Sequence, residues 1–173
     1  MTLDPCNFPL VGWSTAKLLA DRGVPNEVLA RLTQLRVVTG VIGDDGLLDL
    51  DERGEPFLAF YCEASQDVIF WCIENGKLAT WRGRAFALGE DNLRNAATYA
   101  FDCHLHVHAG ALEWLVDGAR GIVVLRWDLA FDLLRDVPRI ATAEALLPTY
   151  QRAMRPSRLP ELAVLASKWR IAA

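Results

Sequence analysis

The chain has 173 residues, of which 52% are hydrophobic and 23% charged, and its formal net charge is −4. This length and composition exclude a disordered chain and predict a buried core, while the negative charge argues against non-specific nucleic-acid binding by the whole surface. No apolar run reaches the roughly 18 residues that span a bilayer, so the sequence predicts a cytoplasmic protein without membrane contact.

Two short helices are predicted at the N-terminal end, where no basic segment precedes an apolar one and no secretory signal peptide is expected. Ser14 is suited to cap a helix over residues 15–22, and Pro25 is suited to open a second one. Between residues 28 and 35, apolar side chains recur with the spacing of one buried helix face. We interpret the pair as a helical hairpin, because its second helix offers few basic side chains to a DNA groove.

The next part of the chain predicts an antiparallel meander, because apolar and β-branched runs alternate with polar turns. The predicted strands cover residues 37–42, 47–50, 57–62, 68–73 and 77–81. Asn75-Gly76 suits the centre of a type I′ turn, a register that pairs Cys72 with Ala79. Both faces of this hairpin are apolar, so we expect it to be central and covered on both sides, by helices or by a partner subunit.

Strands and helices then alternate towards the C-terminus. Predicted strands at 86–88, 101–109 and 121–125 are interleaved with predicted helices at 111–116, 127–135 and 142–154. Pro148 is expected to kink or split the last helix. This order predicts an α+β fold, with a mostly antiparallel sheet of about five to seven strands packed with helices. We expect a single domain over 1–173, made of an N-terminal helical pair (1–36), a sheet core (37–138) and a basic helical C-terminal segment (139–173).

All three histidines, His104, His106 and His108, lie in one six-residue run, 103–108. Alternate side chains of a strand face the same way, so the imidazoles are predicted to share a face. Neighbouring members, about 6.6 Å apart at Cα, have the spacing to chelate one zinc or iron ion, whereas the outer two, about 13 Å apart, do not. A complete site needs a carboxylate or thiolate from elsewhere, and Asp102 on the same face is too far from His106.

The same run also has a purely structural interpretation. The residues of opposite parity between 101 and 109 are all apolar, which is the alternation of a half-buried strand with one solvated face. Two predictions therefore stay open at this point. One is a metal centre on these histidines with zinc or another divalent ion as cofactor, and the other is a solvated strand face without a cofactor.

The cysteines and the charge distribution indicate further features. Three cysteines, Cys62, Cys72 and Cys103, lie in apolar runs without a C-x-x-C pair, which is typical of buried, reduced thiols. The segment 139–173 carries six basic and two acidic side chains, and suits either an acidic partner, nucleic acid included, or contact with the acidic body of the same chain. Trp residues of the double-sided hairpin are candidate anchors for a protein partner or self-association. The candidate contact residues are Arg152, Arg155 and Arg158 in the basic segment, and Trp71 and Trp81 in the hairpin.

Three segments resemble a group of known proteins: ATWRGRAFALGE (79–90), WLVDG (114–118) and GIVVLRW (121–127). The chain resembles, over about residues 69–160, uncharacterised small bacterial proteins of plasmids and other mobile elements. The resemblance implies an accessory role in a mobile element and brings no activity, cofactor or site residue with it.

The sequence therefore favours a small cytoplasmic accessory protein of a bacterial mobile element that acts, without catalysis, through protein–protein contacts. It contains no nucleophile elbow, P-loop or dinucleotide-binding glycine motif, which disfavours several classes of enzyme. Two alternatives remain. One is a metal-dependent hydrolase that uses the histidine strand with a carboxylate, and the other is a nucleic-acid-associated protein that uses the basic C-terminal segment.

Overall fold

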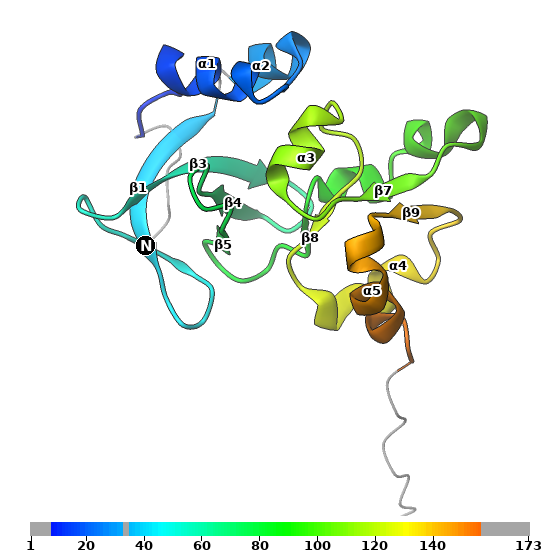
Figure 1. The fold of residues 1–173 in the computed structure, drawn as a ribbon. Coiled ribbons are helices and arrows are strands. Elements are labelled where there is room, and N and C mark those ends of the chain that lie inside the picture. Colours follow the sequence, from blue (N-terminus) through cyan, green and yellow to red (C-terminus); the bar gives the residue numbers. More distant parts are fainter. Residues whose placement is uncertain (1–7, 33–34, 157–173) are drawn as a thin grey trace, which may run out of the picture.

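A computed structural model describes residues 8–32 and 35–156 and confirms the predicted α+β fold (Figure 1). The helices are α1 (Trp13–Asp21), α2 (Asn26–Leu32), α3 (Ala111–Val116), α4 (Ala130–Leu134) and α5 (Leu147–Ala153). The 3-10 turns are η2 (Glu90–Leu93), η3 (Ala96–Asp102), η4 (Trp127–Leu129) and η5 (Glu144–Leu146). The strands are β1 (Arg36–Ile42), β2 (Leu48–Leu50), β3 (Glu55–Cys62), β4 (Asp67–Trp71), β5 (Leu78–Thr80), β6 (Ala87–Leu88), β7 (Leu105–Val107), β8 (Val123–Val124) and β9 (Ile140–Thr142).

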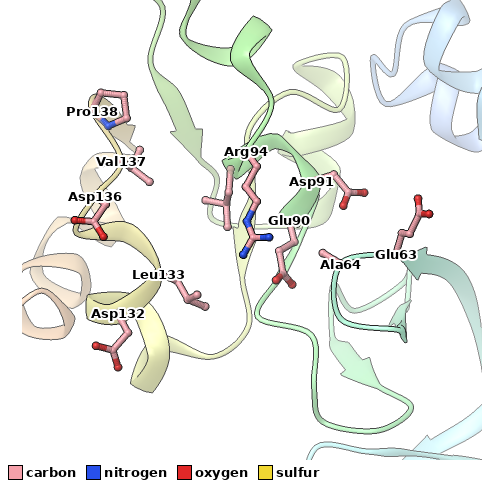
Figure 2. A pocket seen from close by; sticks show the side chains of 11 residues that line it. Glu63, Ala64, Glu90, Asp91, Arg94, Asp132, Leu133, Asp136, Val137 and Pro138 are labelled. Carbon is pink, nitrogen blue, oxygen red and sulfur yellow. The ribbon is translucent and has the colours of Figure 1, made fainter.

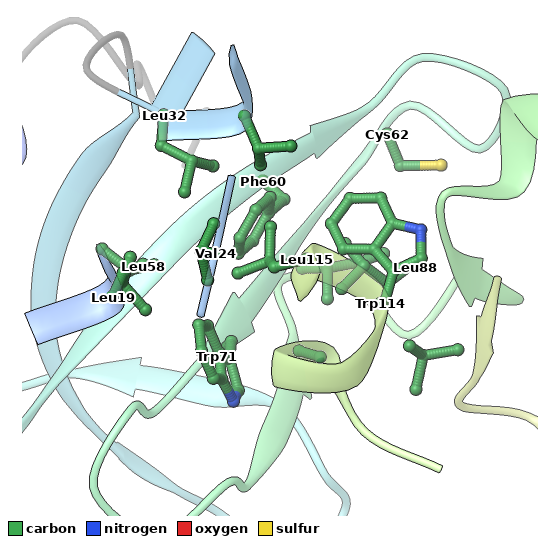
Figure 3. Close-up of a cluster of buried hydrophobic side chains, with 14 of the residues drawn as sticks. Leu19, Val24, Leu32, Leu58, Phe60, Cys62, Trp71, Leu88, Trp114 and Leu115 are labelled. Carbon is green, nitrogen blue, oxygen red and sulfur yellow. The ribbon is translucent and has the colours of Figure 1, made fainter. Parts of the chain in front are cut away.

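The main sheet has five antiparallel strands in the order β2-β1-β3-β4-β5. Strand β4, which lies between β3 and β5, is buried at every position, as expected for a strand that is apolar on both faces. One face packs under α1, α2 and α3, where Phe60 meets Trp114 edge-on and Trp71 is 1% exposed (Figure 3). On the opposite face, Phe57 and Phe70 form a second cluster with residues of β1 and β2. The hairpin is therefore buried on both faces as predicted, but it is not central, because β5 is an edge strand of the sheet.

The hairpin register differs from the prediction. Phe70 pairs with Ala79, which shifts every pair by two residues, so the two faces keep their expected members. The cause is a longer turn: Gly76 N donates to Cys72 O, and Gly76 adopts φ +74°. Within this loop Asn75 Oδ1 accepts the N–H of Lys77 at 3.0 Å, and Asn75 Nδ2 donates to Glu55 Oε2 at 2.9 Å. Asn75 thus bonds within the wider loop and to β3, and the loop takes the place of the predicted type I′ turn.

A smaller core lies beside the main sheet. Strands β6 and β8 pair antiparallel, β7 and β9 pair parallel, and α4 and α5 pack on them (Figure 1). The centre of this core is formed by Phe86, Leu105, Ile122 and Leu134, all at most 1% exposed. The predicted apolar run 121–125 is indeed buried over Ile122 to Val124, although only Val123–Val124 forms a strand.

The buried carboxylate of Asp67 joins the main sheet to the segment that leads into the smaller core. Asp67 is 1% exposed and begins β4. Its oxygens accept backbone N–H groups of Val68, Arg82, Arg84 and Ala85 at 2.7–3.1 Å. Four such bonds satisfy a buried charge and fix the turn that follows β5.

Two helix predictions need correction. The first helix begins at Trp13 with Gly12 as its N-cap, so Ser14 lies inside the helix instead of capping it. The last predicted helix is shorter, because Thr142 ends β9 and Pro148 lies in the first turn of α5. Proline is tolerated there since its missing N–H needs no partner, so it opens a helix and separates it from η5. The predicted tail from residue 157 onward lies outside the described residues.

Candidate metal centre

The strand that carries the histidines is shorter than predicted. Strand β7 covers only Leu105–Val107, whose two apolar side chains are buried, so His106 and His108 both face outward. The predicted alternation fails before Leu105, because the chain there forms η3 and Phe101 and Cys103 are exposed. Apolar residues at positions 101 and 103 extended the alternating pattern towards the N-terminus, so the predicted strand over 101–109 was too long.

The chain after β7 brings a carboxylate back to the histidines. Helix α3 has Gly110 as its N-cap and Asp117 as its C-cap. The N–H of Gly110 donates to Glu113 Oε2 at 2.9 Å. Gly118 and Ala119 then adopt left-handed conformations, φ +78° and +60°, and reverse the chain. The chain returns along β7, where Ile122 N donates to the carbonyl of His106 at 2.8 Å. Asp117 therefore lies beside the two imidazoles.

His106, His108 and Asp117 form one cluster, in which a ligand atom from each lies within 4.8 Å of the others. His106 Nδ1 is 2.8 Å and His108 Nε2 is 3.3 Å from the same oxygen, Asp117 Oδ2. His108 Nε2 also lies 3.0 Å from the carbonyl oxygen of Arg120. Because carboxylate and carbonyl oxygens only accept, both ring nitrogens carry their protons in this arrangement.

The donor set of the cluster suits a divalent transition metal. Two imidazole nitrogens and one carboxylate are ligands of catalytic zinc and of non-haem iron(II). Ligands about 2.1 Å from a tetrahedral ion lie about 3.4 Å from each other, close to the 3.3 Å between His108 Nε2 and Asp117 Oδ2. The side chains of His106 and Asp117 are 48% and 35% exposed, so an ion and water reach the cluster from solvent.

Glycine at position 121 is required for this arrangement. A Cβ on Gly121 would lie 2.1 Å from the carbonyl oxygen of His106, and Gly121 has φ +73°. Trp114 Nε1 and Asn92 Nδ2 donate to the Gly121 carbonyl at 3.1 and 2.8 Å. These contacts fix the segment around Gly121 against β7, and so help to keep Asp117 close to His106 and His108.

The structure separates His104 from the other two histidines. His104 lies before β7, is exposed, and is not part of the cluster of His106, His108 and Asp117. Asp102, which shared the predicted histidine face, pairs with Arg139 at 2.7 Å. Of the predicted metal residues, the structure therefore brings together His106 and His108.

The predicted interaction residues occupy different environments. Trp71 is buried in the main core, and Trp81 is half-buried with its ring edge-on to Phe70 at 6.5 Å. Arg152 and Arg155 are exposed at α5 and just after it, whereas Arg158 lies outside the described residues. The two tryptophans thus serve packing, and the two described arginines belong to the surface.

The cysteines differ in a similar way. Cys62 and Cys72 are buried free thiols as predicted, but Cys103 is exposed because it follows η3 instead of lying in a strand. Burial raises the pKa of the Cys62 thiol above its ordinary value. Cys6 lies outside the described residues.

Two cavities near the smaller core have opposite character. One of about 560 Å³ is lined by carboxylates of Glu63, Glu90, Asp91, Asp132 and Asp136 around Arg94 (Figure 2). The Glu90 carboxylate also has a structural partner, the backbone N–H of Phe86 at 3.1 Å. The second cavity, of about 300 Å³, has His104, His106 and Arg120 in its lining, and His106 also belongs to the cluster.

Comparisons with protein-family models, with curated proteins and with solved structures find no match for this chain. The resemblance to bacterial mobile-element proteins therefore stays a prediction. Within the described ranges, no helix is both long and apolar enough to cross a membrane.

Asp117 is the member of the cluster that sequence reasoning missed. The predicted helix over 111–116 ends just before Asp117, and no ligand role was predicted for this residue. The short length of this helix was the available signal. Helix α3 has only six residues, and the segments before and after it run parallel at Val107 and Ile122. The C-terminal end of α3 therefore lies close to β7. A carboxylate at such an end is a ligand candidate for side chains on the solvated face of the strand.

Proposed function

We propose that the chain binds one divalent transition-metal ion through His106, His108 and Asp117. The observation that carries the proposal is the convergence of two imidazole nitrogens and one carboxylate oxygen within 4.8 Å. A bound ion takes the lone pairs of His106 Nδ1 and His108 Nε2, so each neutral ring then carries its one proton on the other nitrogen. Binding weakens at low pH, because a protonated imidazole has no lone pair for the ion. Zinc, iron(II) and manganese(II) all suit this donor set.

An ion held by three protein ligands keeps positions for water and substrate, which is the arrangement of catalytic rather than structural zinc sites. Such an ion lowers the pKa of bound water to about 7 and supplies hydroxide for hydrolysis. This supports the metal-dependent hydrolase among the predicted functions. The non-catalytic accessory protein that acts through protein contacts stays a prediction.

Equilibrium dialysis of purified, chelator-treated protein against zinc, with elemental analysis, tests the metal site. We expect one ion per chain, and cobalt(II) in its place should give a visible absorption spectrum. His106→Asn and Asp117→Asn should each weaken binding by more than the roughly 10- to 100-fold that loss of an outer-shell partner costs. Far-ultraviolet circular dichroism shows whether each variant keeps its fold.

His104→Asn is the matched control, because His104 has the same chemistry, lies two residues from His106 and is outside the cluster. Its zinc affinity should equal that of the wild type. Wild-type protein that takes up no ion, or an Asp117→Asn variant with unchanged affinity, would overturn the proposal.

A further inference from the structure

The cavity of about 300 Å³ beside the cluster, here called the Arg120 cavity, is built from three parts of the chain. Its lining consists of Asn92, Asn95, Ala97, Thr98, Cys103, His104, His106, Arg120 and Gly121. His106 belongs both to this lining and to the metal cluster. The carbonyl of Arg120 lies 3.0 Å from His108 Nε2, so the backbone of the cavity's arginine adjoins the cluster as well. A molecule in the cavity therefore lies next to the proposed ion.

The lining of the Arg120 cavity is unusual in its charge. The chain has 22 acidic and 18 basic side chains, yet none of the nine described residues that line this cavity carries a carboxylate. The 560 Å³ cavity near α4, by contrast, has five carboxylates around one arginine. An acid-free, basic cavity in an acidic protein favours an anionic ligand.

Arg120 has the freedom to bind such a ligand. Arg126, Arg135 and Arg139 each form an ion pair with an aspartate, but no described carboxylate lies within ion-pair distance of the Arg120 guanidinium. Arg120 is exposed and lines both this cavity and a neighbouring one near α2 that also contains Glu27 and Asp117. A guanidinium offers two parallel N–H groups to two oxygens of one phosphate or carboxylate.

The opposite wall is fixed by its own hydrogen bonds. Asn92 Nδ2 donates to the carbonyls of Ala119 and Gly121, and Thr98 Oγ1 donates to the Asn92 carbonyl at 3.0 Å. Asn95 Oδ1 accepts the N–H of Ala97 at 3.0 Å. These groups shape the cavity, whose side-chain donors for a ligand include Arg120, the exposed His104 and the amide of Asn95.

We propose that the Arg120 cavity binds the phosphate group of a small phosphate monoester, with two phosphate oxygens on the Arg120 guanidinium and the phosphorus beside the metal ion. The inference rests on the proposed metal site and names its substrate class. The volume of the cavity lies at the lower end of small-molecule sites, which suits a compact ester better than a polymer. A tetrahedral dianion also matches the combination of one arginine and one divalent ion.

Calorimetric titration of the zinc-loaded full chain with inorganic phosphate tests this proposal. Phosphate should bind, and Arg120→Gln should weaken binding about 10- to 100-fold, the loss expected for one bidentate charged contact. The same variant should keep the zinc affinity of the wild type, because the Arg120 side chain is not a ligand. Arg135→Gln, which removes an exposed arginine paired with Asp136 away from the cavity, is the control and should bind phosphate normally.

The outcomes distinguish this proposal from the metal site. Zinc binding without phosphate binding, or an Arg120→Gln variant with unchanged phosphate affinity, would overturn the phosphate site and leave the metal site intact. Absence of zinc binding would overturn the proposed function and, with it, the placement of the phosphorus beside an ion. Acetate that binds more tightly than phosphate would overturn the choice of phosphate in favour of a carboxylate substrate.

Discussion

Arg139 holds the backbone on both sides of Phe101. Its guanidinium donates to the carbonyl oxygens of Tyr99 at 2.7 Å and Cys103 at 3.1 Å, and it pairs with Asp102 at 2.7 Å. Inside this clamp, Phe101 has φ +52° and ψ +39°, and its side chain is fully exposed. A non-glycine residue pays about 1–2 kcal/mol for this left-handed conformation, so the contacts of Arg139 offset a local strain.

Replacement of Phe101 by glycine should therefore stabilise the protein. We expect the free energy of unfolding to rise by about 0.5–1 kcal/mol, because glycine adopts the left-handed region freely and the exposed ring loses no packing. Urea unfolding measures the change. Ala100→Gly is the control at an extended residue, φ −63° and ψ 149°, and should lower stability slightly. If the Phe101→Gly protein is less stable than the wild type, the left-handed conformation of Phe101 is not a source of strain.

Asp67→Asn should destabilise the fold strongly. The substitution removes the charge from a buried group that accepts four backbone N–H bonds, and it points an amide N–H₂ at other donors. We expect a loss of about 3 kcal/mol in the free energy of unfolding, measured by chemical denaturation. Asp132→Asn, an exposed acid on α4, should change stability by less than about 0.5 kcal/mol. Equal effects of the two variants would refute a structural role for Asp67.

Gly121→Ala should disrupt the metal cluster as well as the fold. Its Cβ would lie 2.1 Å from the His106 carbonyl, so the returning chain must move away from β7. Gly46→Ala is the matched control, since Gly46 also has positive φ, +77°, but nothing lies within 4 Å of the added Cβ. We expect Gly46→Ala to cost about 1–2 kcal/mol from backbone strain alone, and Gly121→Ala to cost more.

The readout for this pair is denaturant unfolding together with zinc affinity. Only Gly121→Ala should weaken zinc binding, because only that change displaces His106. A Gly121→Ala variant that binds zinc like Gly46→Ala would show that the contact between residue 121 and His106 does not position the cluster.

The described thiols should react at different rates with a disulfide reagent. In a Cys6→Ser background, exposed Cys103 should react fast and Cys62 slowly at pH 8, because burial raises the pKa of Cys62 and leaves less thiolate. A raised pKa moves the rise of the Cys62 rate to higher pH. Absorbance of the released thiol follows both phases, and the fast phase should vanish in Cys103→Ser. A fast phase that survives this change would contradict the exposure of Cys103.

Local patterns predicted the elements of the main sheet well. The apolar runs around Phe57 and Phe70 were predicted as strands because short apolar runs are typical of buried strands. This prediction depends on residue type and does not require the pairing between strands to be known. The register was wrong by two residues, because the turn is longer than the type I′ turn that Asn75-Gly76 indicates: Gly76 N donates to Cys72 O, and Asn75 bonds Lys77 and Glu55. The assignment of side chains to the two faces of the hairpin stayed correct, because a shift of two residues equals the period of a strand.

The candidate site was predicted in part for a comparable reason. The alternation of Leu105 and Val107 predicted that His106 and His108 share a solvated face. Both lie on the same face, but only His106 is exposed, and His108 is largely covered. Asp117 was missed, because its proximity depends on a chain reversal through Gly118 and Ala119 and on a parallel return beside β7. Periodicity describes one element at a time and does not indicate where the next element returns.

The cluster's three side chains come from a single short stretch of chain, with His106 and Asp117 only eleven residues apart. Loops of about ten residues close in roughly 10–100 ns, well before strands distant in sequence find each other. We therefore expect the side chains of His106, His108 and Asp117 to come together early in folding, before the strands of the five-stranded sheet pair. A metal ion present at that stage would be captured by a nascent hairpin of β7 and α3 and would act as a folding nucleus for the smaller core.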